Sequence, residues 1–214
     1  NNLLNLNLVS YFFSLFCILV LMNGSNFMDG VNLLSIGYFL MVLTSIFFVS
    51  ENSQLEINLS LIKNLLLILI FLFLMNFFNK IFLGDNGIYL LSFIIAIILI
   101  KFYNDNELVS PYYVICLLWY PCFENLFSII RKKTKNINPQ KADNLHLHHL
   151  LYKKFAVIKS VQLRNNLTGL SILSFNIPIF LLSSYNYNHT KILVILIFLS
   201  VVLYLISYFY LKKS

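Results

Sequence analysis

Long apolar runs separated by short polar segments constrain this chain more than any other feature of its sequence. A helix rises about 1.5 Å per residue, so about 20 apolar residues cross the hydrocarbon core of a bilayer. The runs lack the polar–apolar alternation of a transmembrane β-barrel. The sequence therefore predicts an all-α polytopic membrane protein, a helical bundle forming a single transmembrane domain over 1–214. About seven spans are expected, at roughly 8–22, 31–49, 61–78, 88–102, 112–130, 167–184 and 192–210.

Composition supports the membrane assignment and excludes other classes. Hydrophobic residues make up 59% of the chain and charged residues 11%, whereas a soluble domain is about a quarter charged. Cys17, Cys116 and Cys122 lie in apolar runs without a CxxC pair, which predicts buried thiols and no disulfide framework or zinc site. The net charge of +7 is clustered, and such clusters in an apolar chain report topology and anionic lipid. The predicted partner is the lipid bilayer, with no nucleic acid.

The distribution of Lys and Arg predicts the orientation of the spans. Nine of the 15 basic residues lie in the loop 131–166, which is therefore expected to be cytoplasmic. Alternation of the spans then places 23–30, 79–87 and the C-terminal tail on the same side, and the two tail lysines agree with this. Three polar islands are thereby predicted on one side of the membrane: Asn23–Gly30, Phe82–Gly87 and His146–His149.

The first island is Asn23-x-x-Asn26-x-x-Asp29-Gly30. On a helix, this spacing places Asn23, Asn26 and Asp29 along one side. At a broken helix end, the amides would instead bond freed backbone groups. An ordinary turn built from Asn, Gly and Asp explains the composition equally well, so the pattern leaves these alternatives open.

Asp85 lies between Gly84 and Gly87 and opens the fourth span. A helix N-terminus offers unpaired N–H groups to an anion. A carboxylate there can hold Mg²⁺ while the N–H groups and Lys80 face phosphate oxygens. The alternative is that Asp85 simply caps the helix.

Three of the four histidines, His146, His148 and His149, fall within four residues. A zinc site needs further ligands, and Asp143 is the near candidate, but the basic surroundings disfavour a cation. Imidazoles among Lys and Arg residues such as Arg131 suit an anionic ligand such as phosphate. A basic loop lying on anionic lipid would explain the Lys and Arg but not the histidines, so phosphate binding is favoured.

Glu124 is the one carboxylate well inside a predicted span. An ionisable group at that depth predicts a functional site or a buried pair. Arg131 lies about two helical turns away, too far for an i,i+4 pair. The partner of Glu124 is therefore expected to come from another helix.

At these residues the chain resembles the polyprenyl-phosphate N-acetylhexosamine-1-phosphate transferase superfamily, in its undecaprenyl-phosphate GlcNAc-1-phosphate transferase-like branch. The island ending in Asp29-Gly30 is similar to the family element Asn-x-x-Asn-hydrophobic-x-Asp-Gly. The segment 76–87 is similar to Phe-hydrophobic-Gly-Asp-x-Gly-Ser, and 143–150 is similar to Asp-x-x-His-x-His-His-x-Leu. These elements come in family order and touch nearly the whole chain.

The resemblance implies transfer of an N-acetylhexosamine-1-phosphate from a UDP-sugar to undecaprenyl phosphate, with release of UMP. It implies a requirement for Mg²⁺, with Mn²⁺ as a substitute. Such an enzyme starts a cell-envelope polysaccharide at the cytoplasmic side of the bacterial inner membrane, with a homodimer as a candidate assembly. With the local patterns, it predicts the catalytic residues Asp29, Asp85 (also the metal ligand), His146, His148 and His149, and the substrate-binding residues Asn23, Asn26, Asn76, Lys80 and Arg131.

Several positions depart from the family pattern. Asn32 stands where the family has a second Asp, Ile88 where it has Ser and Glu124 where it has Asp, and no Asp-Asp dipeptide occurs. Two interpretations follow: the C-terminal portion of a longer enzyme, or an inactive relative that acts as an assembly partner. A transporter is disfavoured because only Glu124 lies deep in a span.

Overall fold

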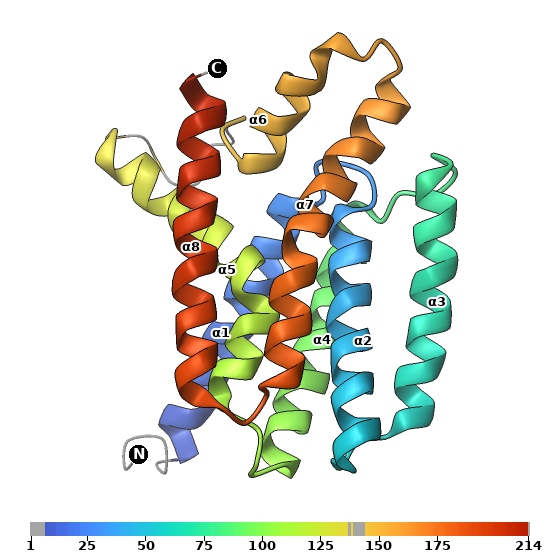
Figure 1. Cartoon of the computed structure of the whole chain (residues 1–214), viewed down its shortest axis with the longest axis vertical. Coiled ribbons are helices and arrows are strands. Elements are labelled where there is room, and N and C mark those ends of the chain that lie inside the picture. The colour runs from blue at the N-terminus through green and yellow to red at the C-terminus, as the bar shows by residue number, and fades with distance from the viewer. Residues whose placement is uncertain (1–6, 137, 139–143, 214) are drawn as a thin grey trace.

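The computed structural model describes residues 7–136, 138 and 144–213, and every regular element in this part of the chain is helical (Figure 1). Seven helices are long and apolar enough to cross a membrane. The predicted all-α polytopic bundle with seven spans is therefore confirmed. The elements are α1 (Asn7–Met28), α2 (Leu34–Ser53), α3 (Leu59–Phe77), α4 (Gly84–Asp105), α5 (Pro111–Thr134), α6 (Leu147–Lys154), the 3₁₀ turn η1 (Phe155–Val157), α7 (Val161–Tyr185) and α8 (Thr190–Lys213).

The membrane-spanning helices are longer than the apolar runs that predict them, as α1 and α4 illustrate. Helix α1 continues through the polar residues Asn23 and Asn26 to Met28, and α4 begins already at Gly84. Backbone hydrogen bonding continues through polar residues, so the end of an apolar run does not mark the end of a helix. The helical alternative for Asn23 and Asn26 is thus confirmed.

Local sequence signals explain where several helices begin. The side chain of Asn58 accepts a hydrogen bond from the backbone of the first turn of α3 (3.0 Å). Ser110 caps α5 with Pro111 directly after it, and Ser160 caps α7. These residues satisfy N–H groups that a helix start leaves without partners.

The helices pack as a layered bundle around α1, α2, α5 and α7 (Figure 1). Helix α1 packs on α4 and α5, α2 packs on α3 and α7, and α5 also packs on α8. Two glycines allow backbones to approach closely, as is common between membrane helices. A Cβ at Gly24 would lie 2.2 Å from the carbonyl oxygen of Pro121, and one at Gly169 would lie 2.0 Å from that of Asn32.

The connections gather into two groups at opposite ends of the bundle. At one end, the side chain of Asn106 bonds both the N–H (2.7 Å) and the carbonyl (3.0 Å) of Glu56, and the N–H of Ser110 bonds the carbonyl of Tyr187 (3.0 Å). At the other end lie α6 and the α1–α2 and α3–α4 connections (Figure 1). The predicted polar islands all belong to this second end.

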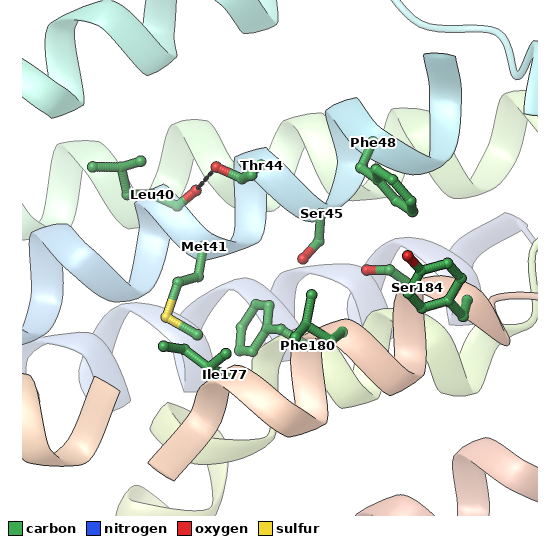
Figure 2. Close-up of a pocket in the computed structure, with 10 residues that line it drawn as sticks. Leu40, Met41, Thr44, Ser45, Phe48, Ile177, Phe180 and Ser184 are labelled. Carbon is green, nitrogen blue, oxygen red and sulfur yellow. Dashed lines mark hydrogen bonds between the residues drawn. The ribbon is translucent and has the colours of Figure 1, made fainter. Parts of the chain in front are cut away.

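An apolar cavity of about 260 Å³ lies between α2 and α7 (Figure 2). Its lining runs from Leu40 to Phe48 on α2 and from Ile177 to Tyr185 on α7, the halves that lead away from the polar islands. From Ser35 the helix rises about 7.5 Å to Leu40, the first lining residue on α2, and none of the lining residues lies in a polar island. This cavity is therefore separate from the candidate active site.

Candidate active site

The end of α1 lies directly against the histidines that precede and begin α6. The ring of Phe27 stacks on His146 with centroids 4.9 Å apart. A Cβ at Gly30 would lie 2.8 Å from Nε2 of His148 and 3.5 Å from Cε1 of His149. Two polar islands that lie more than a hundred residues apart are thus in contact.

Asp29 lies just beyond the last residue of α1 and is half-buried. The hydroxyl of Ser35 donates to its Oδ1 at 2.5 Å. Burial raises the pKa of Asp29 above its ordinary value, the Ser35 hydrogen bond opposes this, and the charge of Asp85 raises the pKa further. The influence of Asp85 on Asp29 joins the remaining island to the site.

Asp85 lies in the first turn of α4 and is exposed. The interpretation of Asp85 as the helix cap is wrong, because the cap position is Leu83 and no side chain caps this helix. Gly84 adopts a left-handed backbone conformation (φ 62°), which glycine accommodates without strain. The carboxylate of Asp85 is therefore directed to solvent beside Asp29 instead of closing the helix.

His146, His148 and His149, here called the histidine cluster, pack ring against ring. The centroids of His148 and His149 are 4.2 Å apart, and those of His146 and His148 are 5.6 Å apart. His148 is 1% exposed, and neither of its ring nitrogens has a hydrogen-bond partner. Burial, opposed by the charge of Glu124 but reinforced by the other two imidazoles, lowers the pKa of His148 to about 3. A neutral imidazole with two unsatisfied nitrogens is well suited to bind a polar ligand.

The buried carboxylate of Glu124 finds its partner in this cluster. Its Oε2 lies 3.0 Å from Nδ1 of His146, and its Oε1 accepts a hydrogen bond from the N–H of Leu147 (3.0 Å). The prediction of a partner from another helix is confirmed by the N–H of Leu147, the first residue of α6, whereas His146 directly precedes that helix.

A polar cavity of about 440 Å³ adjoins the histidine cluster, within the size range of small-molecule sites. It lies between the residues that follow α1, helix α6 with the segment just before it, and the start of α7. A basic side chain, an imidazole, a phenol and two amides can all reach a ligand there, which suits phosphate groups and hydroxyls. The lining residues are Gly30, Val31, Asn144, His149, Tyr152, Lys153 and Asn165.

Asn76 lies at the same end but is engaged within the chain. Its Oδ1 accepts from the N–H of Leu33 (2.6 Å), and its Nδ2 donates to the carbonyl of Ile81 (2.8 Å). The amide oxygen thereby fixes the end of α3 against the start of α2, and the amide nitrogen holds the connection that follows α3. Substrate binding by Asn76 stays a prediction.

Asn32, at the position of the family's second Asp, is engaged in the same way. Its Nδ2 donates to the side-chain oxygens of Asn79 and Asn166 (3.0 Å for Asn166) and approaches the carbonyl of Asn76 at 3.5 Å. We call Asn32, Asn76, Asn79 and Asn166 the asparagine cluster. Position 32 requires a hydrogen-bond donor here, since the atoms facing its amide nitrogen are acceptors.

The other predicted substrate-binding residues differ in how they are placed. Asn23 is exposed and Asn26 partly exposed on α1, and Lys80 is exposed after α3. The guanidinium of Arg131 is buried, where it donates to the carbonyl of Leu145 and to the hydroxyl of Tyr208 (3.1 Å). Arg131 therefore joins α5 to α8, and contact of any of these four residues with substrate stays a prediction.

Asp143 lies outside the described residues. Within the part that the structure describes, no group of three or more His, Cys, Asp or Glu side chains is placed to hold a metal ion. Mg²⁺ needs fewer protein ligands, because one or two carboxylates plus substrate phosphates and water complete its coordination. Asp29 and Asp85, close enough for one charge to shift the other, fit that mode of binding.

The fold and this site together define a polytopic membrane protein with a polar centre at one end of its helical bundle. Residues 1–103 match the family described as glycosyl transferase family 4. Over 98 residues the chain is 31% identical to the undecaprenyl-phosphate alpha-N-acetylglucosaminyl 1-phosphate transferase of Thermotoga maritima, covering 43% of this chain and 32% of that protein. The N-terminal part of the chain is thus similar to glycosyl transferase family 4, and the resemblance to the polyprenyl-phosphate sugar-1-phosphate transferases is confirmed. No solved structure matches the chain.

The family match holds Asp29 and Asp85, whereas the histidine cluster and Glu124 lie beyond it. The structure brings the two parts together through Phe27 and Gly30. The contributors to the site that were not predicted from the sequence include Ser35 and Tyr152. Neither belongs to a polar run, so only the fold reveals them.

Proposed function

We propose that this protein transfers a sugar-1-phosphate, an N-acetylhexosamine-1-phosphate, from a UDP-sugar to undecaprenyl phosphate at the cytoplasmic face of the bacterial plasma membrane. The observation that carries the proposal is the meeting of Asp29, Asp85 and the histidine cluster at one end of the bundle. These groups combine carboxylates for a cation with imidazoles for phosphate, which is what transfer between two anionic substrates requires.

In the proposed reaction, a phosphate oxygen of the prenyl phosphate attacks the β-phosphorus of the UDP-sugar. A new P–O–P bond forms, the bond between the β-phosphorus and the bridging oxygen breaks, and UMP leaves with the electron pair. Asp29 and Asp85 would hold Mg²⁺, which when bound neutralises negative charge on the donor's phosphates. The product is a lipid-linked sugar that begins a cell-envelope polysaccharide.

In this proposal the donor's phosphates would lie beside the histidine cluster. His148 has two buried nitrogens to satisfy, and the adjoining polar cavity offers Lys153 and Tyr152 to an anionic, hydroxyl-rich molecule. In this arrangement the nucleotide stays at the aqueous end while the prenyl chain remains in lipid.

The test is release of UMP by the purified protein in liposomes that contain undecaprenyl phosphate, with UDP-N-acetylglucosamine and Mg²⁺. We expect metal-dependent release that chelation abolishes and that Mn²⁺ restores in place of Mg²⁺. Release that is equal with and without a divalent cation would contradict the proposal.

A non-catalytic relative that serves as an assembly partner is the second candidate. It is favoured by Asn32, whose amide is committed to the asparagine cluster at a position where the family has Asp. Titration of UDP-sugar binding against Mg²⁺ separates the two, because an enzyme of this type binds its donor in a metal-dependent manner and a scaffold does not.

A further inference from the structure

Glu124 is a carboxylate buried within the membrane-spanning helix α5, and the proposed reaction gives it no direct contact with substrate. It is 1% exposed. Placing an ionisable group at that depth is costly, so its contacts indicate what it is retained for.

Both carboxylate oxygens of Glu124 reach the start of α6. Oε1 accepts from the N–H of Leu147 (3.0 Å), and the hydroxyl of Tyr120 lies 3.4 Å from the same oxygen. Oε2 lies 3.0 Å from Nδ1 of His146. A carboxylate only accepts hydrogen bonds, so Nδ1 of His146 carries the proton and its Nε2 is left as an acceptor in the neutral ring.

The side chain of Glu124 therefore fixes both the backbone at the start of α6 and the imidazole ring of His146. The N–H of Leu147 belongs to the first turn of α6, where unpaired N–H groups favour a negative charge. His148 and His149 lie on that same turn. The position of Glu124 thus sets where all three imidazoles lie relative to the end of α1.

The ring of His146 is also held from both faces. Phe27 stacks on one side at 4.9 Å, and His148 lies nearly parallel at 5.6 Å with an interplanar angle of 10°. Because the ring is held on both faces, its orientation is fixed, and what can still vary is which of its two nitrogens carries the proton. Glu124 selects the tautomer because its carboxylate accepts a hydrogen bond from Nδ1 of His146.

We propose that Glu124 is the positioning residue of the histidine cluster, selecting the Nδ1-protonated form of His146 and anchoring α6 so that the imidazoles meet the phosphates. This inference rests on the proposed function for its catalytic consequence. Carboxylates that orient an imidazole in this way change activity without touching substrate, typically by about 10- to 100-fold.

The experiment combines ¹⁵N-histidine magnetic resonance of the full chain in liposomes with UMP-release kinetics. The His146 signal is assigned by its loss in His146→Gln. In the unaltered protein we expect Nδ1 of His146 to be protonated. In Glu124→Gln the tautomer shifts toward Nε2–H and kcat falls about 10- to 100-fold, with KM for the UDP-sugar little changed.

Glu124→Asp keeps the carboxylate and is expected to restore the tautomer and much of kcat. The matched control is Asn125→Ala, which removes a buried amide on the next residue of α5 whose bond is to the carbonyl of Val20 (3.4 Å). It should lower the unfolding temperature and leave tautomer and kcat unchanged.

Two results would overturn the proposal: an unchanged tautomer in Glu124→Gln, or a loss in that variant that Asn125→Ala reproduces. If no UDP-sugar yields UMP with the unaltered protein, the proposed function fails. The tautomer measurement still decides whether Glu124 positions His146.

Discussion

The histidine cluster and the asparagine cluster lie at the same end of the bundle, and both hold buried polar side chains. In the asparagine cluster, the amide groups bond one another and the ends of α2, α3 and α7. In the histidine cluster, His148 is equally buried but both of its ring nitrogens lack hydrogen-bond partners. Buried polar groups are normally satisfied, so the first cluster indicates structure and the second a ligand.

The largest effect on activity is expected at Asp85, one of the two carboxylates near the histidine cluster. Under the proposed function, Asp85→Asn should lower UMP release about 1000-fold because it removes a carboxylate that would hold Mg²⁺, while the exposed position keeps folding intact. Asp105→Asn is the matched control, being the same change on an exposed residue at the opposite end of α4. Equal activity in the two variants would remove Asp85 from the site.

His148→Leu separates ligand binding from stability. We expect UMP release to fall about 100-fold. The unfolding temperature should rise, because the unsatisfied imidazole destabilises the folded state by about 1–3 kcal/mol. Thermal unfolding in detergent and activity are measured on the same preparation. If His148→Leu lost both stability and activity, His148 would have a structural role like that of the asparagine cluster.

Asn32→Asp tests the asparagine cluster, where a substitution is expected to lower stability instead of raising it. The new carboxylate would face acceptor oxygens of Asn79 and Asn166, so the free energy of unfolding should fall by about 1–3 kcal/mol. Affinity for Mg²⁺, measured by calorimetry, should not increase. A tighter Mg²⁺ site at unchanged stability would show that position 32 still belongs to the metal centre.

The effect confined to acidic pH is a change in stability due to His148. Its pKa is about 3 in the folded protein and ordinarily 6.5, so between these values the unfolded chain binds the extra proton. Stability from this group is full above pH 6.5 and falls as the pH is lowered toward 3. At pH 5 the loss is about 2 kcal/mol, and it should be absent from His148→Leu.

All seven spans could be predicted from sequence because a bilayer selects for runs of apolar residues, a signal that depends on composition alone. Helix α6 was not predicted, since eight residues with two histidines and two lysines carry no such signal. The meeting of Asp29, Asp85 and the histidines follows from topology and the family pattern. The burial of Asn76 and Arg131 could not be predicted in this way, because it depends on which distant segments pack against each side chain.

Gly30 links the two halves of the site in a way that bears on how related chains can differ. Any side chain there would occupy space that the imidazole of His148 already fills, since even a Cβ would lie 2.8 Å from Nε2. Exchange at position 30 therefore requires the imidazole of His148 to move or to be replaced by a smaller side chain. Sequences that share this architecture should vary at these two places in concert, or at neither.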